Sequence, residues 1–167
     1  MLKKIALIVL CALPFSLFSQ EKLGYINSES IIQLMPEIET IKKTVDELSA
    51  TWEKELLKMR EEYSTKIKEF QEREKTMSEA IREVRITEIQ ELESRITTTQ
   101  QTAVANIQKK QQELFTPVIE KVKKAINDVG AEGSFTYIFD TSSQVILYQS
   151  PKANDVTPLV KKKLNIK

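Results

Sequence analysis

The chain has 167 residues and carries 25 lysine and arginine residues against 24 aspartate and glutamate residues, so its formal charge is close to zero. It contains no histidine and a single cysteine, Cys11, which argues against imidazole bases, thiolate nucleophiles and the usual zinc sites. The balanced charge gives no electrostatic argument for nucleic acid as a partner. We therefore expect no enzymatic activity, no cofactor and no metal site.

Positions 1–20 have the layout of a secretory signal peptide. Two lysines precede an apolar run that is too short to be a comfortable membrane span. Cleavage after Ser19 or Gln20 would remove Cys11 and change the formal charge from +1 to −1. The alternative is an uncleaved anchor. The prediction is export to the periplasm with the signal removed.

The first folded elements are expected between residues 22 and 36. Residues 22–27 are predicted to form a short strand, and either Asn27 or Ser28 can accept a hydrogen bond from a free amide in the first turn of the following helix. A helical turn over 29–34 then meets Pro36. Proline disfavours helix at the residue before it and suits the first turn of a new helix, so a break is predicted there.

Between Pro36 and Pro117 the chain runs eighty residues without glycine or proline. Glycine costs a helix interior about 1 kcal/mol and proline about 3 kcal/mol, so this composition predicts uninterrupted helix. Apolar residues recur at steps of three and four, which is typical of a coiled coil. Such a narrow stripe needs a partner. The stripe in the outgoing half consists of Ile38, Ile41, Val45, Leu48, Trp52, Leu56, Met59, Tyr63, Ile67 and Phe70.

A hairpin of two helices would supply that partner from the same chain, whereas a single rod of eighty residues would reach about 120 Å. Thr76 and Glu79 match the pattern in which a threonine caps a helix and a glutamate three residues later reciprocates. They lie near the midpoint between the two prolines. We therefore predict a hairpin with this cap at its tip, and keep one continuous rod as the alternative. The predicted pairs are Ile38 with Val118, Ile41 with Phe115, Trp52 with Val104, Ile67 with Ile89, and Phe70 with Ile86.

The carboxyl-terminal part is predicted to return to mixed structure. The apolar pattern continues past Pro117, so the helix is expected to kink there and to stop between Gly130 and Gly133. Alternating apolar residues predict strands over 134–140 and 144–149, joined by a hairpin turn at 140–143.

A last helix is expected over 154–167. Thr157 is its predicted cap, Pro158 suits its first position, and lysines follow near its carboxyl end. Only about three short strands are then available for a globular body. Because so small a sheet is marginal by itself, we expect the chain to oligomerise.

Several short segments, in this order, are similar to a known family. They are Leu-Gly-Tyr-Ile-Asn at 23–27 with Pro36 soon after, Phe-Thr-Tyr-Ile-Phe-Asp at 135–140, Val-Ile-Leu-Tyr at 145–148, and Asp-Val-Thr at 155–157. With the long charged helical region between them, the chain resembles the Skp/OmpH family of periplasmic chaperones over its whole mature length.

The resemblance implies an α+β fold with a small β-strand trimerisation body and one long α-helical coiled-coil hairpin per subunit. Residues 21–36 and 117–167 would form the body, and residues 37–116 the hairpin, with its tip near 75–79. It also implies a homotrimer that encloses unfolded outer-membrane proteins between its arms without ATP, and the chain has no glycine-rich phosphate loop. The alternative function is a structural or adaptor coiled coil of the cell envelope that binds a folded partner.

Two sets of residues are candidates for these contacts. Adaptable apolar side chains near the far end of the hairpin could touch clients, or could simply fill the seam between the helices. Aromatic residues of the body are expected in its core and at the subunit interface. Because basic and acidic residues are mixed at the tip, no site for lipopolysaccharide or a membrane surface is assigned. The client candidates are Met59, Tyr63, Phe70 and Met77, and the body candidates are Tyr25, Phe135, Tyr137, Phe139 and Tyr148.

Overall fold

The computed structural model describes residues 21–143 and 145–166, so the predicted signal peptide lies outside the described residues. The chain divides into two compact units. We call them the body, which comprises the described residues up to Leu34 and from Lys121 onward, and the arm unit, Met35–Glu120. Within the described ranges, no helix is both long enough and apolar enough to cross a membrane.

The body begins with strand β1 (Leu23–Ile26), followed by helix α2 (Ser28–Gln33). Of the two candidate caps it is Asn27 that acts, because its side-chain oxygen accepts the backbone N–H of Ser30 at 2.9 Å. This bond satisfies one of the amides that a helix start leaves without a partner. Both elements were predicted.

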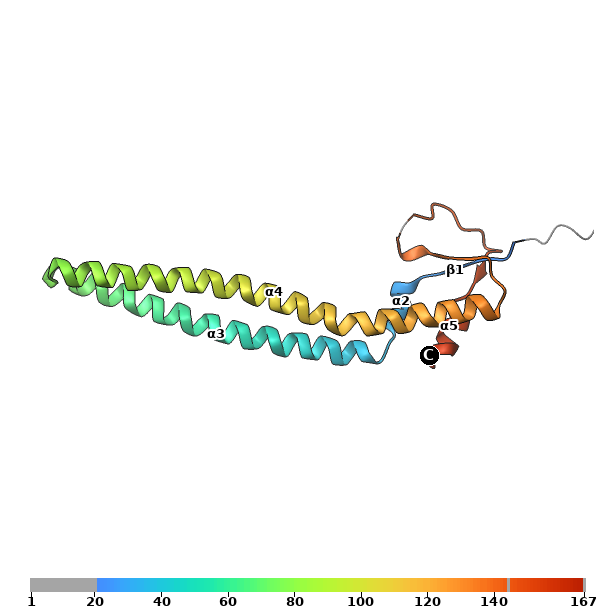
Figure 1. Cartoon of the computed structure of the whole chain (residues 1–167), viewed down its shortest axis with the longest axis horizontal. Helices are drawn as coiled ribbons and strands as arrows, with labels where there is room; N and C mark the ends of the chain where they lie inside the picture. The colour runs from blue at the N-terminus through green and yellow to red at the C-terminus, as the bar shows by residue number, and fades with distance from the viewer. Residues whose placement is uncertain (1–20, 144, 167) are drawn as a thin grey trace, which may run out of the picture. The chain divides into compact units, whose positions relative to one another are not determined.

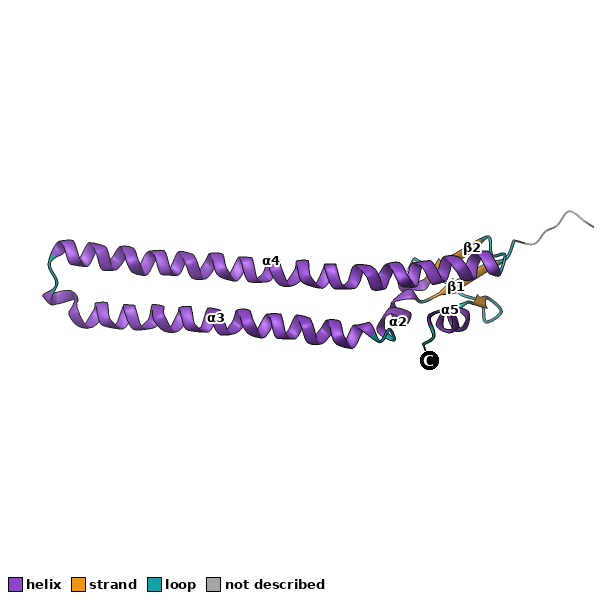
Figure 2. Cartoon of the chain, turned by 60° about the horizontal axis from the view of Figure 1, so that its bottom comes forward, coloured by secondary structure: helices purple, strands orange, loops and turns teal. Residues whose placement is uncertain are grey.

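The arm unit is a helical hairpin. Helix α3 (Glu37–Arg73) starts directly after Pro36, and a short 3₁₀ turn, η2 (Glu74–Thr76), leads to helix α4 (Glu79–Glu132). Figures 1 and 2 show α3 and the facing part of α4 running side by side from the turn. The predicted hairpin is therefore confirmed, and the continuous rod is wrong.

The predicted cap at the tip is wrong in its residue. The hydroxyl of Thr76 donates to the carbonyl of Arg73 at 2.9 Å, so it closes the turn that ends the first arm. Helix α4 begins only at Glu79, and the carboxylate of Glu79 binds Arg82. The same short polar sequence could serve either helix end, because a threonine hydroxyl both donates and accepts.

Which residues are buried between the two arms depends more on their position around the helix than on whether they are apolar. Val104, the predicted partner of Trp52, is half exposed, and Ile86 is also exposed. An ion pair between Lys66 and Glu88, at 3.5 Å, joins the two arms. The neighbouring Ala103 is buried in place of Val104. The buried seam residues are Ile38, Ile41, Leu56 and Met59 on α3, and Leu92, Ala103 and Val118 on α4.

Helix α4 continues through Pro117 and ends at Glu132, as the apolar pattern predicted. Gly130 is still helical, and the N–H of Gly133 closes the last turn on the carbonyl of Val129 at 2.9 Å. The left-handed residue after the helix is Ser134, with φ 52°, so neither glycine serves as a left-handed cap. Gly133 is required for space, because a Cβ there would lie 2.5 Å from the Phe135 ring.

The sheet differs from the predicted hairpin. Strand β2 (Tyr137–Asp140) and strand β3 (Asn154–Asp155) both pair in parallel with β1, which gives the order β2-β1-β3. Leu23 lies opposite Tyr137 and Tyr25 opposite Asp155. No strand forms over residues 145–150, so the second predicted strand and the hairpin turn are wrong.

The chain makes a local turn directly after β2. Thr141–Ser143 forms a 3₁₀ turn, η3, in which the Asp140 carboxylate accepts the N–H of Ser142 at 3.0 Å and the Ser143 hydroxyl donates to the Asp140 carbonyl at 3.0 Å. These bonds close a local turn on Asp140, and the neighbour of β2 in the sheet is β1.

The chain ends in helix α5 (Thr157–Leu164). Its predicted cap is wrong by one position: Val156 precedes the helix and has no side-chain cap bond, and the Asp155 carboxylate accepts the N–H of Thr157 at 2.8 Å. Pro158 lies in the first turn and three lysines lie in the last, both as predicted. The helix covers the body core, in which Ile26, Ile31, Val122, Val156 and Val160 are almost completely buried.

Candidate functional site

The four client candidates do not have equal access to solvent. Met59 is only 8% exposed and belongs to the seam. Tyr63, Phe70 and Met77 are half-buried, so each keeps part of its surface available. The structure therefore separates one seam residue from three that are partly accessible.

Phe70 and Met77 lie together at the hairpin tip. With Ile81 and Ile89 they line a cavity of about 240 Å³, whose rim carries charged side chains. Met77 is in an extended conformation between η2 and α4 and belongs to neither helix. A thioether on such a segment can adapt to differently shaped apolar groups.

Charges of both signs flank this cavity. Glu88 binds Arg85 at 2.8 Å on its own helix and Lys66 at 3.5 Å across the seam. The hydrogen bond from Arg85, more than any other contact, holds the pKa of Glu88 below its usual range. On α4, the hydrogen bond with Glu79 raises the pKa of Arg82. Charged side chains at the tip therefore form local pairs of opposite sign.

Several exposed apolar residues on the arms were missed by the sequence analysis. A signal was present, since each lies outside the three-four stripe and so cannot fill the seam. They are Leu57 on α3 and Ile81 and Val84 on α4, and Val104, which was predicted to lie in the seam, is exposed as well.

The body aromatics divide into an inner and an outer group. Phe135 is half-buried, with its ring against the position of Gly24 and under the ammonium of Lys22 at 4.2 Å. Tyr137 and Phe139, on one face of edge strand β2, are 60% and 46% exposed, and their ring centroids are 6.1 Å apart. Tyr25 is half-buried and Tyr148 is 80% exposed. In the single chain, the core is therefore aliphatic, and most of these aromatics lie outside it.

Asp140 ties the end of β2 to the start of α2. Its carboxylate accepts the backbone N–H of Ser28 at 3.1 Å, the hydroxyl of Ser28, and the N–H of Ser142. Partial burial by itself would raise the pKa of Asp140, but these hydrogen bonds outweigh it and hold the pKa below its usual value. The ionised Asp140 carboxylate therefore links two segments that lie more than one hundred residues apart in the sequence.

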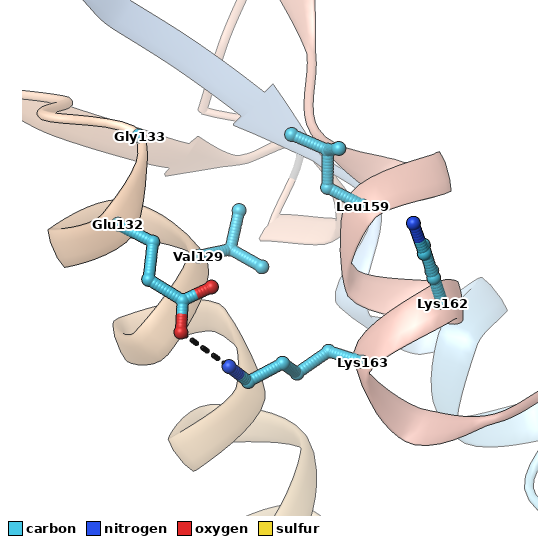
Figure 3. Close-up of a pocket in the computed structure, with 6 residues that line it drawn as sticks. All are labelled: Val129, Glu132, Gly133, Leu159, Lys162 and Lys163. Carbon is cyan, nitrogen blue, oxygen red and sulfur yellow. Dashed lines mark hydrogen bonds and ion pairs between the residues drawn. The ribbon is translucent and has the colours of Figure 1, made fainter.

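A hollow of about 500 Å³ lies between the end of α4 and α5. Figure 3 shows Val129 and Leu159 pointing into it from the two helices, with the ion pair between Glu132 and Lys163 at one side. That pair raises the pKa of Lys163, mainly through its hydrogen bond. Among the described residues, no group of three or more potential metal ligands comes together, here or elsewhere.

Comparisons with known proteins show which proteins this chain is similar to. No curated protein matches the chain. A crystal structure from Caulobacter crescentus, described as a candidate OmpH-like outer membrane chaperone, superposes with a TM-score of 0.72 at 13% identity, covering 88% of this chain and 85% of that one. At that identity the likeness shows the fold alone. The model of the OmpH-like outer membrane protein family matches residues 22–164, and the chain belongs to that family.

Proposed function

We propose that the protein is an ATP-independent periplasmic holdase chaperone that binds unfolded outer-membrane proteins and prevents their aggregation. The family match over residues 22–164 carries this proposal. A chaperone role also suits arms on which exposed apolar residues are scattered singly among charges. Many weak contacts of this kind keep a client soluble and still allow its release.

The working form would be a homotrimer built on the body. The outer aromatics Tyr137, Phe139 and Tyr148 are too exposed for a stable monomer surface, and β2 lies at an open edge of the sheet. Residues 145–150 carry further exposed side chains, with Leu147 97% exposed. Copies of the same chain would cover these groups and place the arms around a shared cavity.

Export to the periplasm, with the signal peptide removed, is part of the same proposal. The mature chain would then have neither cysteine nor histidine. Holding unfolded polypeptides requires none of the chemistry that those residues supply.

Aggregation of an unfolded membrane protein provides the main test. The purified protein should suppress light scattering when a urea-unfolded β-barrel protein is diluted into buffer, at close to one trimer per client. Native mass measurement should give three chains. No suppression, with tight binding to a folded envelope protein instead, would favour the adaptor alternative.

A matched pair of methionines tests the client contacts. Met77→Ala at the tip should weaken client binding and leave thermal melting unchanged, because Met77 is partly accessible. Met59→Ala should lower the melting temperature, because that side chain is buried in the seam. Equal effects on melting would assign Met77 to the seam as well.

A further inference from the structure

The returning arm contains one segment without charge. From Ile96 to Gln108 the sequence has no aspartate, glutamate, lysine or arginine, although Arg95 and Lys109 bound it and the rest of the arm is densely charged. Residues of this segment recur at steps of three, four, seven, eight and eleven along α4, so they form one continuous helix face. We call this face the amide belt; it consists of Thr97, Gln100, Gln101, Val104, Ala105 and Gln108.

The amide belt is hollowed and lies outside the seam. Its six residues line a depression of about 480 Å³. Val104, in the middle, is 52% exposed, whereas the neighbouring Ala103 is buried in the seam. From Thr97 to Gln108 the belt is about 16 Å long, the length of about five residues of extended chain.

The polar groups of the amide belt differ in their availability. The hydroxyl of Thr97 already donates to the carbonyl of Glu93 at 3.1 Å. The side-chain amides of Gln100, Gln101 and Gln108 make no hydrogen bond with any other residue that the structure describes. Each offers two N–H donors and one carbonyl acceptor, the same groups that a polypeptide backbone carries.

We infer that the amide belt binds extended, uncharged segments of unfolded polypeptide, with client backbone groups on the glutamine amides and a small apolar side chain over Val104. This inference rests on the proposed holdase function. Charge selects the occupant, because a charged client side chain would lose hydration here without finding an opposite charge. Membrane-spanning β-strands supply suitable segments, since they alternate apolar and polar residues in runs of about ten.

The test compares two exposed apolar residues on the arms. Val104 lies in the amide belt, whereas Leu57, 56% exposed, lies among charged residues of α3. The probe is a fluorescein-labelled ten-residue peptide that alternates serine and valine, and binding is read by fluorescence anisotropy. Val104→Glu should weaken binding about five- to tenfold, and Leu57→Glu less than about twofold. Emission of the single tryptophan, Trp52, and native mass should match wild type in both variants.

Photo-crosslinking identifies the occupant. A photoreactive residue in place of Val104 should crosslink to an unfolded β-barrel client. Crosslinks only to another copy of this chain would overturn the inference and make the belt an arm-to-arm interface. Equal weakening by Val104→Glu and Leu57→Glu would also overturn it, while wild-type suppression of light scattering would leave the holdase proposal intact. Wild-type protein that fails to suppress scattering would overturn the proposed function by itself, and peptide anisotropy would still report on the belt.

Discussion

The body and the arm unit are stabilised in different ways. All five of the largest fully buried side chains lie in the body, where residues far apart in sequence meet on a sheet of three short strands. In the arm unit, the buried residues form a strip about one residue wide along each of the two helices, and most other side chains are exposed to water. Stability is therefore concentrated in the body and distributed in the arms, so the same substitution should have unequal effects in the two.

The largest difference is expected from removing an isoleucine. Ile26→Ala in β1 should lower the free energy of unfolding by about 2–5 kcal/mol, because the side chain is 1% exposed and its loss leaves a cavity. Ile86→Ala on the arm should change it by about 0.5 kcal/mol or less, because Ile86 is exposed. Urea titrations followed by circular dichroism measure both values. Similar losses of unfolding free energy at the two positions would contradict the difference between the body and the arm unit.

Two glycines of the body should respond to alanine with opposite signs. In Gly133→Ala the new methyl would lie 2.5 Å from the Phe135 ring and 3.0 Å from the carbonyl oxygen of Val129, so a loss of about 1–3 kcal/mol is expected. In Gly130→Ala the nearest atom is 3.4 Å away and the residue is helical, so a gain of about 0.5–1 kcal/mol is expected. Thermal melting of the two variants checks the sign. A stabilised Gly133→Ala would mean that the Phe135 ring moves aside freely.

Asp140→Asn should weaken the body by about 1–2 kcal/mol, because an amide replaces a carboxylate that accepts from Ser28 and Ser142. The pKa of Asp140 is lowered in the folded chain, so its contribution is fully present above the unfolded-state pKa of about 4 and is lost as pH falls through the lower folded value. Unfolding at neutral pH and at progressively lower pH should show the two proteins converging. A constant difference across that range would show that the carboxylate charge is not the cause.

The same contrast explains how much the sequence could predict. The arms follow from local rules, since the lack of glycine and proline and the three-four period predict helix, and the Thr76–Glu79 pattern predicted the turn that the structure has between α3 and α4. The sheet does not follow from local rules. Strand β1 pairs in parallel with segments more than one hundred residues later in the chain, and no local sequence pattern identifies such a partner. Alternation at 144–149 instead suggested a nearby hairpin, but residues 145–150 form no strand.

Within the candidate site the prediction was also uneven. Apolar character identified Phe70 and Met77 at the tip. The same criterion misplaced Val104, because the neighbouring Ala103 is the residue buried in the seam and the valine is left half exposed. Helix phase, counted from Leu92 through Ala103, would have corrected it. The amide belt was not predicted as a binding surface, because uncharged polar residues give no apolar stripe.

The smallest effect is expected at the ion pairs of the arms, which are many and individually weak. Glu88→Gln removes the partner of both Arg85 and Lys66, but all three side chains are at least partly solvated, and exposed pairs contribute little. The melting temperature should fall by about one degree at low salt and by less at high salt, because the pairs are screened. Lys43→Gln, which breaks the solvated 4.0 Å pair with Glu47 within one helix, is the matched control and should have no measurable effect. Since Lys66 and Glu88 join the two arms, any excess over this control measures how far an exposed charge pair helps to set the register. A large, salt-independent loss at Glu88 would mean that part of the arm's stability is concentrated at the tip, and the division between a concentrated body and distributed arms would not hold.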